Sequence, residues 1–147
     1  MSNHTAGSST TCSLDMAQGQ YIWWVDSDDW IEPDSLQLLH EASCEDKPDI
    51  VKFNFMRNGS SENAFFSNAP VGFYCGEQLL YQAFLKPGAF NLSAWGHIYR
   101  AAFLKENQLS FVSERLVGSE DYLFNLQAFF AADKIRVIEN CLYHYRL

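Results

Sequence analysis

Tyr21-Ile22-Trp23-Trp24-Val25-Asp26-Ser27-Asp28-Asp29-Trp30 is the stretch that decides the fold expected of this chain. Residues 21–25 form a continuous run of apolar, β-prone side chains, which is typical of a strand buried on both faces in a parallel sheet. The run leads directly into a group of acids, and α/β sheets gather their ligands at the carboxyl ends of strands. We therefore expect a functional site immediately after Val25.

Helical and strand patterns alternate along the rest of the chain. We expect helices over 33–44, 76–85, 101–107 and 119–132, strands over 49–56, 134–139 and 141–145, and a short edge hairpin within 57–70. The buried face of the last helix is predicted to consist of Leu123, Phe124, Leu126 and Phe130. This alternation indicates the α/β class. Residues 1–13 are rich in Ser and Thr, which predicts a disordered or non-native leader before a domain over 14–147.

Composition narrows the classes of function. The 147 residues include 18 Asp and Glu against 10 Lys and Arg, a net charge of -8. A general binder of nucleic acid needs a basic surface, so we expect no nucleic-acid partner. An acidic chain fits a protein that holds a cation, or that binds an anionic ligand through one. No apolar run reaches the roughly 18 residues of a membrane span, and no signal peptide is visible. We expect a cytoplasmic protein, with peripheral contact at the inner face of the membrane left open.

The acids after residue 25 are unusually dense. Five carboxylates fall within nine residues, without a Lys or Arg among them: Asp26, Asp28, Asp29, Glu32 and Asp34. Like charges this close raise one another's pKa unless a cation or N–H donors compensate them. Glu32 and Asp34 fit as acids at a helix N-terminus. Asp26 and Asp28, at the end of the predicted strand, are placed to hold Mg²⁺ or Mn²⁺ together with phosphate oxygens.

The acidic stretch has three other interpretations. A calcium-binding EF-hand is excluded, because Trp30 stands at the fifth position and Gln37 at the twelfth. A phosphatase with an aspartate nucleophile also begins with a strand followed by Asp-x-Asp, and it stays open as an alternative. So does a purely structural interpretation, in which the acids are turn residues at the end of a strand.

A second motif, Gly118-Ser119-Glu120-Asp121, opens the predicted helix over 119–132. Backbone N–H groups and the helix dipole hold a carboxylate at this position in its ionised form. An ionised carboxylate is what a general base must be before it accepts a proton. The alternative is a plain helix start with two acids that complement the dipole.

Together these motifs resemble a known family. The segment from Met16 to Pro33, which contains Val25-Asp26-Ser27-Asp28-Asp29, resembles the central motif of family 2 glycosyltransferases of the GT-A fold. The segments 93–100, 103–111, 120–126 and 142–146 resemble the acceptor half of that family. Their order and spacing match bacterial members that build capsule, exopolysaccharide or lipopolysaccharide outer chains. The resemblance implies an incomplete GT-A fold over 14–147, a mixed sheet flanked by helices that lacks the N-terminal nucleotide-binding strands.

The resemblance also implies a mechanism. An inverting enzyme of this family transfers a sugar from a nucleotide-sugar donor to a hydroxyl of a glycan or lipid-linked acceptor. Asp26 would contact the ribose or the metal, and Asp28 would coordinate the Mn²⁺ or Mg²⁺ that bridges the diphosphate. Asp29 would help to position the donor sugar. Asp121 would deprotonate the acceptor hydroxyl, and Glu120 would bind the acceptor or brace the helix.

Other residues take less definite roles from the resemblance. Trp95 and Trp30 are candidates for sugar or acceptor contact, with a place in the core as the alternative for Trp95. His144 is a candidate metal ligand. Without the opening strands of the family, the strand over 21–25 would show an open edge that invites self-association. We expect the chain alone to have little or no activity, and a non-catalytic binding module derived from the GT-A fold stays open as an alternative function.

Overall fold

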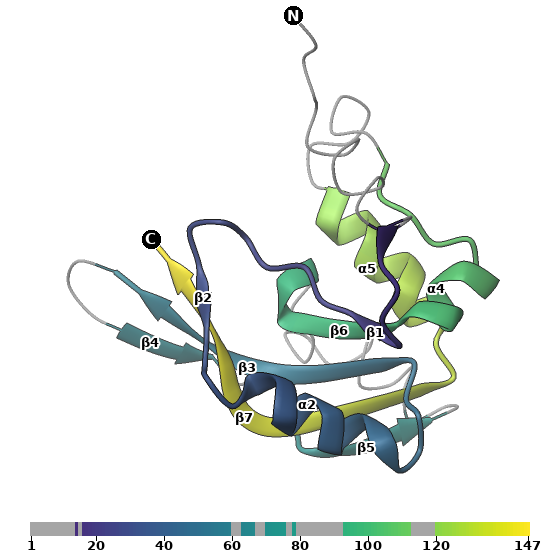
Figure 1. The fold of residues 1–147 in the computed structure, drawn as a ribbon, viewed down its shortest axis with the longest axis horizontal. Coiled ribbons are helices and arrows are strands. Elements are labelled where there is room, and N and C mark those ends of the chain that lie inside the picture. Colours follow the sequence, from purple (N-terminus) through teal and green to yellow (C-terminus); the bar gives the residue numbers. More distant parts are fainter. Residues whose placement is uncertain are drawn as a thin grey trace, which may run out of the picture.

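A computed structural model describes residues 14, 16–59, 63–66, 70–75, 78, 93–112 and 120–147. Within them the chain forms one mixed sheet with helices on both faces (Figure 1). The strands are β1 (Tyr21–Ile22), β2 (Trp30–Ile31), β3 (Ile50–Asn58), β4 (Asn63–Phe66), β5 (Gly72–Cys75), β6 (His97–Arg100) and β7 (Lys134–Arg146). The helices are α2 (Ser35–Cys44), α4 (Ala101–Glu106), α5 (Glu120–Ala131) and the 3-10 helix η2 (Ala94–Gly96).

The sheet is built around two long central strands. Its order is β1-β6-β3-β7-β2, with β4 added to β3 and β5 added to β7. Strands β3 and β7 run parallel, and the other pairs are antiparallel. Two short strands, β1 and β2, bracket residues 26–29, so the predicted acidic segment connects opposite ends of the strand order. The mixed α/β architecture predicted from the sequence is confirmed.

Alternate residues of β3 enter two separate cores. Ile50 packs on one face with apolar residues of α4 and α5, among them Phe103, Phe124 and Phe129. Val51 and Phe53 pack on the other face, which α2 covers through Leu39. The β3 residues in the core that α2 covers, Val51, Phe53 and Phe55, are all apolar. On the opposite face Ile50 is followed by the buried polar residues Lys52 and Asn54.

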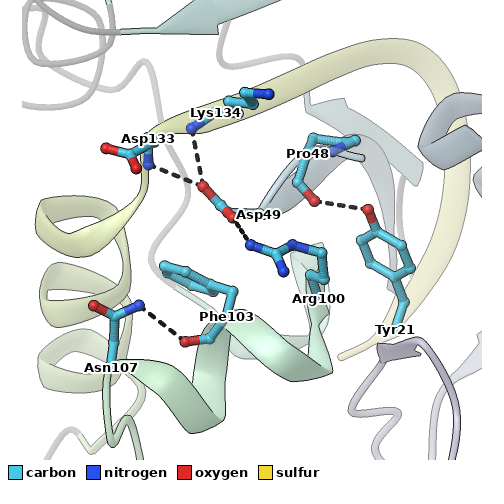
Figure 2. Close-up of polar contacts among 8 residues, drawn as sticks. All are labelled: Tyr21, Pro48, Asp49, Arg100, Phe103, Asn107, Asp133 and Lys134. Carbon is cyan, nitrogen blue, oxygen red and sulfur yellow. Dashed lines mark hydrogen bonds and ion pairs between the residues drawn. The ribbon is translucent and has the colours of Figure 1, made fainter. Parts of the chain in front are cut away.

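A carboxylate clamp fastens the start of β3 to its neighbours (Figure 2). The side chain of Asp49 accepts hydrogen bonds from the Arg100 guanidinium at 2.5 Å and from the backbone N–H groups of Asp133 and Lys134 at 2.9 and 3.0 Å. Its backbone C=O accepts from the N–H of Arg100 at 2.8 Å. The clamp thereby joins β3, the end of β6 and the start of β7.

The predicted strand over 21–25 is partly wrong. Only Tyr21 and Ile22 are in a strand, and they pair antiparallel with β6 rather than parallel. The side chains of 21–24 are half-buried and Val25 is 45% exposed. Trp23 packs into the core beneath α2 and Trp24 into the core beneath α5, so both rings find apolar surroundings without a full-length strand.

The helix over 119–132 is confirmed, but its buried face is partly wrong. Phe124 is buried as predicted, whereas Leu126 and Phe130 are 37% and 69% exposed. Asn125 and Phe129 are buried instead. The Asn125 side chain accepts a 2.6 Å hydrogen bond from the buried hydroxyl of Tyr99, which turns a polar residue toward the core.

The remaining predictions differ in smaller ways. The helix over 33–44 begins at Ser35, and the two final strands form the single strand β7, whose register with β3 shifts between Lys52 and Phe55. Strand β5 was not predicted. Most of the predicted helix over 76–85 lies outside the described residues, as do residues 1–13. In the described part of the chain, no helix has the length and apolarity needed to cross a membrane.

Candidate functional site

Residues Asp26–Asp29, here called the acid loop, are held against β7. The N–H of Asp26 donates to the hydroxyl oxygen of Tyr143 at 3.2 Å, and that hydroxyl donates to Oδ2 of Asp29 at 2.5 Å. Oδ1 of Asp29 accepts from the N–H of Arg146 at 2.8 Å. A turn contact from the N–H of Asp29 to the C=O of Asp26, 3.2 Å long, closes the loop. Both carboxylate oxygens of Asp29 are therefore engaged by β7.

Asp121 faces the same region from the first turn of α5. Its Oδ2 accepts a hydrogen bond from the N–H of Ala94 in η2 at 3.1 Å. The charge of Asp121 is one of those that raise the pKa of Asp26, so the two carboxylates interact through space. The structure thus brings together the two acidic motifs that were separate in the sequence.

The pKa values of both carboxyls shift upward. Desolvation raises the pKa of Asp26 most, followed by the charges of Asp29, Asp121 and Asp28. Desolvation also raises the pKa of Asp121, while the hydrogen bond from Ala94 lowers it and the charge of Glu120 raises it. The N–H donor at the helix start lowers the pKa of Asp121 as expected, but desolvation has the larger effect and the pKa rises overall. A raised pKa brings a carboxylate closer to the range in which a general base works.

Within the described residues, no Lys or Arg side chain forms an ion pair with Asp26, Asp28 or Asp121. Asp28 is exposed and makes no side-chain hydrogen bond to that part of the chain. Uncompensated carboxylate oxygens are hard donors that suit Mn²⁺ or Mg²⁺. No group of three His, Cys, Asp or Glu in the described residues forms a complete metal site. Asp26 and Asp28 could therefore supply only part of the ligands of a cation, and water or a phosphate group would have to supply the rest.

The two candidate tryptophans lie in different surroundings. Trp95 is 9% exposed and stacks on Tyr143, with ring centroids 4.6 Å apart, so its ring belongs to the core as in the alternative given above. Trp30 is 41% exposed. Its ring stacks on His144 at 5.0 Å, with the guanidinium of Arg146 5.7 Å from the ring centre. Of the two, Trp30 is the one with accessible ring surface.

His144 uses both ring nitrogens within the protein. Nε2 lies 2.6 Å from Oε1 of Glu32, and Nδ1 lies 3.2 Å from Nδ2 of Asn58. If Asn58 donates to Nδ1, Nε2 carries the proton and donates to Glu32. A metal would have to displace one of these partners, so the structure does not favour His144 as a ligand. Glu32 is a partner of His144 rather than only an acid beside the helix dipole.

The cavities lie elsewhere. Three cavities of about 440, 490 and 400 Å³ are lined by residues of β1 and its neighbours, and none of their lining residues belongs to the acid loop. Tyr21 and His40 line two of them, and Ile22 lines the other. The candidate site is an acidic surface region of the described residues rather than one of these cavities.

Sequence reasoning missed Tyr143 and Ala94 as parts of the site. The hydroxyl of Tyr143 organises the acid loop, and the backbone N–H of Ala94 holds Asp121. The ending Leu142-Tyr143-His144-Tyr145-Arg146 was matched only as a motif. The alternation of aromatic residues in a predicted strand was the available signal, because it puts Tyr143 and Tyr145 on one face.

A family model, glycosyl transferase family 2, matches residues 2–107. The chain belongs to this family. The family 2 resemblance inferred from the acidic motifs is thus confirmed. The family match covers part of the segment assigned to a leader, and the division at residue 13 stays a prediction.

Family 2 relatives resemble nearly the whole chain. The putative glycosyltransferase EpsH of Bacillus subtilis is 29% identical over 99% of this chain and 42% of the relative. The poly(ribitol-phosphate) beta-N-acetylglucosaminyltransferase TarS of Staphylococcus aureus is 28% identical over 95% of this chain and 23% of that enzyme. The chain spans less than half the length of these family 2 relatives.

A solved structure supports the same family assignment. The crystal structure of S. aureus TarS 1-349 in complex with UDP matches with a TM-score of 0.78 and 25% identity. The match covers 97% of this chain and 40% of that chain. The incomplete GT-A fold expected from the family 2 motifs is therefore confirmed.

Proposed function

We propose that this chain is the metal-binding and acceptor-binding part of an inverting glycosyltransferase. The reaction would move a sugar from a nucleotide-sugar donor to a hydroxyl of a glycan or lipid-linked acceptor, in the synthesis of a surface polysaccharide. The observation that carries the proposal is that Asp26 interacts electrostatically with both Asp28 and Asp121, and that none of the three has a cationic partner among the described residues.

The donor side follows from the acid loop. Asp26 and Asp28 would hold Mn²⁺ or Mg²⁺, whose charge offsets the negative charge of a nucleoside diphosphate as it leaves. Family 2 enzymes generally use divalent cations. TarS has been solved with UDP and with UDP-GlcNAc, which supports a uridine diphosphate sugar as the donor here. Asp29, assigned to the donor sugar by resemblance, would act mainly by holding the loop, since β7 engages both of its oxygens.

The acceptor side follows from α5. Asp121 would take the proton of the acceptor hydroxyl while that oxygen bonds to the anomeric carbon and the bond to the diphosphate oxygen breaks. A single displacement of this kind inverts the configuration. Glu120 would keep the pKa of Asp121 high through its charge and would contact the acceptor. Trp30 offers its exposed ring to the acceptor, whereas Trp95 supports the site from the core.

Cation-dependent nucleotide binding by the 147-residue chain tests the proposal. Calorimetry should show UDP binding that requires Mn²⁺ and is lost in Asp26→Asn and Asp28→Asn. Asp34→Asn is the matched control, because Asp34 lies in the same acidic segment and makes no side-chain cap of α2. Binding that ignores Mn²⁺ and both substitutions would favour a non-catalytic module. Release of phosphate from simple monoesters, lost in Asp26→Asn, would favour the phosphatase.

Self-association through the sheet edge is a further part of the proposal. Among the described residues β1 pairs only with β6, which leaves its other side open. An unpaired strand edge is a template for another chain. Light scattering on the purified chain should show dimers or larger species that fall apart when proline replaces Tyr21. A monomer at all concentrations would contradict this.

A further inference from the structure

The hydroxyl of Tyr143 lies at the centre of the contacts that shape the acid loop. Tyr143 is fully buried in β7. Its hydroxyl donates to Oδ2 of Asp29 at 2.5 Å and accepts from the N–H of Asp26 at 3.2 Å. The hydroxyl of Tyr143 thus contacts both ends of the acid loop, as donor to Asp29 and as acceptor from Asp26. Asp28 lies between these ends, so the position of its carboxylate depends on the shape that the hydroxyl maintains.

The ring of Tyr143 contacts the element that holds Asp121. It stacks on Trp95 in η2 with ring planes 8° apart. The C=O of Trp95 accepts from the indole N–H of Trp23 at 2.8 Å, just before the acid loop. The N–H of the preceding residue, Ala94, donates to Asp121. One side chain therefore touches both halves of the candidate site, through its hydroxyl on one side and its ring on the other.

We propose that Tyr143 is a positioning residue that holds the Asp26 and Asp28 carboxylates in the arrangement needed for a cation and a nucleoside diphosphate. This inference rests on the proposed function and adds to it a residue that acts through Asp29 and touches no substrate. Residues that orient metal ligands from behind commonly change metal affinity by about 10- to 100-fold when they are lost. The ring fills the core, while the hydroxyl orders the loop, so the two roles can be separated by removing one oxygen atom.

The chain offers a matched control for that removal. Tyr145 lies two residues further along β7 and also stacks on Trp95, at 5.5 Å. Unlike the hydroxyl of Tyr143, that of Tyr145 makes no hydrogen bond to the residues that the structure describes. Tyr143→Phe and Tyr145→Phe therefore remove the same atom from two neighbouring stacked rings, and only one removal frees the acid loop.

The experiment measures the affinity of the 147-residue chain for Mn²⁺ in the presence of UDP, by calorimetry. We expect Tyr143→Phe to weaken binding by about tenfold or more, and Tyr145→Phe to stay within about twofold of the unchanged chain. Asp29→Ala should weaken binding to a similar degree. In the double variant Tyr143→Phe with Asp29→Ala, the loss of affinity should be smaller than the product of the two single losses, because both changes break the contact between the Tyr143 hydroxyl and Oδ2 of Asp29.

Hydrogen exchange supplies a readout that needs no ligand. The amides of residues 26–29 should exchange faster in Tyr143→Phe than in Tyr145→Phe, while those of β3 stay equally protected. Unchanged Mn²⁺ affinity in Tyr143→Phe, or effects that multiply in the double variant, would overturn the positioning role. If Asp26→Asn and Asp28→Asn still abolish binding in that case, the proposed function survives. Absence of Mn²⁺-dependent UDP binding in the unchanged chain would overturn both.

Discussion

The clamp at Asp49 and the acid loop at Asp26 each place a carboxylate at an end of the sheet, in opposite surroundings. Asp49 is buried, and its oxygens receive one guanidinium and two backbone N–H groups. Asp26 lies at the surface beside Asp28, Asp29 and Asp121, and its pKa is raised by desolvation and by those charges. The Asp49 carboxylate joins three strands, whereas the carboxylate of Asp26 has no cationic partner among the described residues.

This difference separates structural acids from functional ones better than their count does. A buried carboxylate with its full set of donors stabilises the fold, and losing it leaves its partners unpaired. Several carboxylates that repel one another cost stability, which a protein tolerates where a cation or substrate supplies the missing charge. Asp29 lies between the two cases, since it belongs to the acid loop but has both oxygens engaged by β7.

The largest expected effect comes from breaking the clamp. Asp49→Ala would leave the Arg100 guanidinium and two backbone N–H groups without their acceptor, and we expect a loss of about 3–5 kcal/mol in the free energy of unfolding. Urea unfolding followed by circular dichroism measures it. Asp46→Ala is the control, because it breaks the more exposed ion pair with Arg136 and should cost at most about 1 kcal/mol. If Asp49→Ala and Asp46→Ala lower the free energy of unfolding equally, the clamp at Asp49 contributes no more than an exposed ion pair and the prediction is wrong.

A second prediction concerns the buried imidazole of His97. Burial lowers the pKa of His97 to about 3, the charge of Lys52 adds to this, and Nε2 of His97 has no hydrogen-bond partner among the described residues. In the unfolded chain His97 binds a proton near pH 6.5, whereas in the folded chain it stays neutral down to about pH 3. The contribution of neutral His97 to the free energy of unfolding is therefore fully present above pH 6.5 and decreases as pH falls toward 3. The slope due to His97 should approach about 1.4 kcal/mol per pH unit.

Urea unfolding between pH 4.5 and 7.5 tests the role of His97. His97→Gln should be less stable at pH 7.5 but should lose that part of the pH slope. If the free energy of unfolding of His97→Gln depends on pH as strongly as that of the unchanged chain, His97 does not cause the pH dependence and this prediction is wrong.

The smallest change in stability is expected at the acid loop. Asp26→Asn removes one charge from the repelling group, so the free energy of unfolding at pH 7 should stay equal or rise by about 0.5 kcal/mol after solvent screening. The raised pKa means that the native state holds the proton more tightly, so the contribution of Asp26 to stability decreases as pH rises through the window above the usual carboxylate pKa. Asp26→Asn should flatten the pH dependence there. A clear loss of stability would show that Asp26 is structural, as Asp49 is.

The sequence predicted what depends on residue type and close spacing. The acids at Asp26 and Asp28, the helix predicted over 119–132 and the strand predicted over 49–56 follow from local patterns, and the structure contains the acids together with α5 (Glu120–Ala131) and β3 (Ile50–Asn58). Their mutual approach does not follow from any local pattern, because it depends on η2 packing between β7 and α5. The resemblance to the family supplied that link.

The errors arose where tertiary contacts override a local pattern. Hydrophobicity alone favoured Phe130 for the core. In the structure the face of α5 that carries Asn125 and Phe129 is buried instead, and the hydrogen bond between Asn125 and Tyr99 satisfies the polar side chain there. The run over 21–25 indicated a parallel strand, yet its tryptophans are buried by packing in two different cores. Trp30 and His144 became neighbours through the register of β2 with β7, which no spacing along the chain reveals.

Paramagnetic broadening of amide signals by Mn²⁺ tests most directly whether the acid loop, and not the clamp, binds a cation. We predict that low concentrations of Mn²⁺ with UDP broaden the ¹H–¹⁵N signals of residues 26–29, Ala94 and Asp121, and leave those of Asp49 and Lys134 sharp. The broadening should disappear in Asp28→Asn. Signals that broaden evenly over the chain, or first around Asp49, would contradict the account.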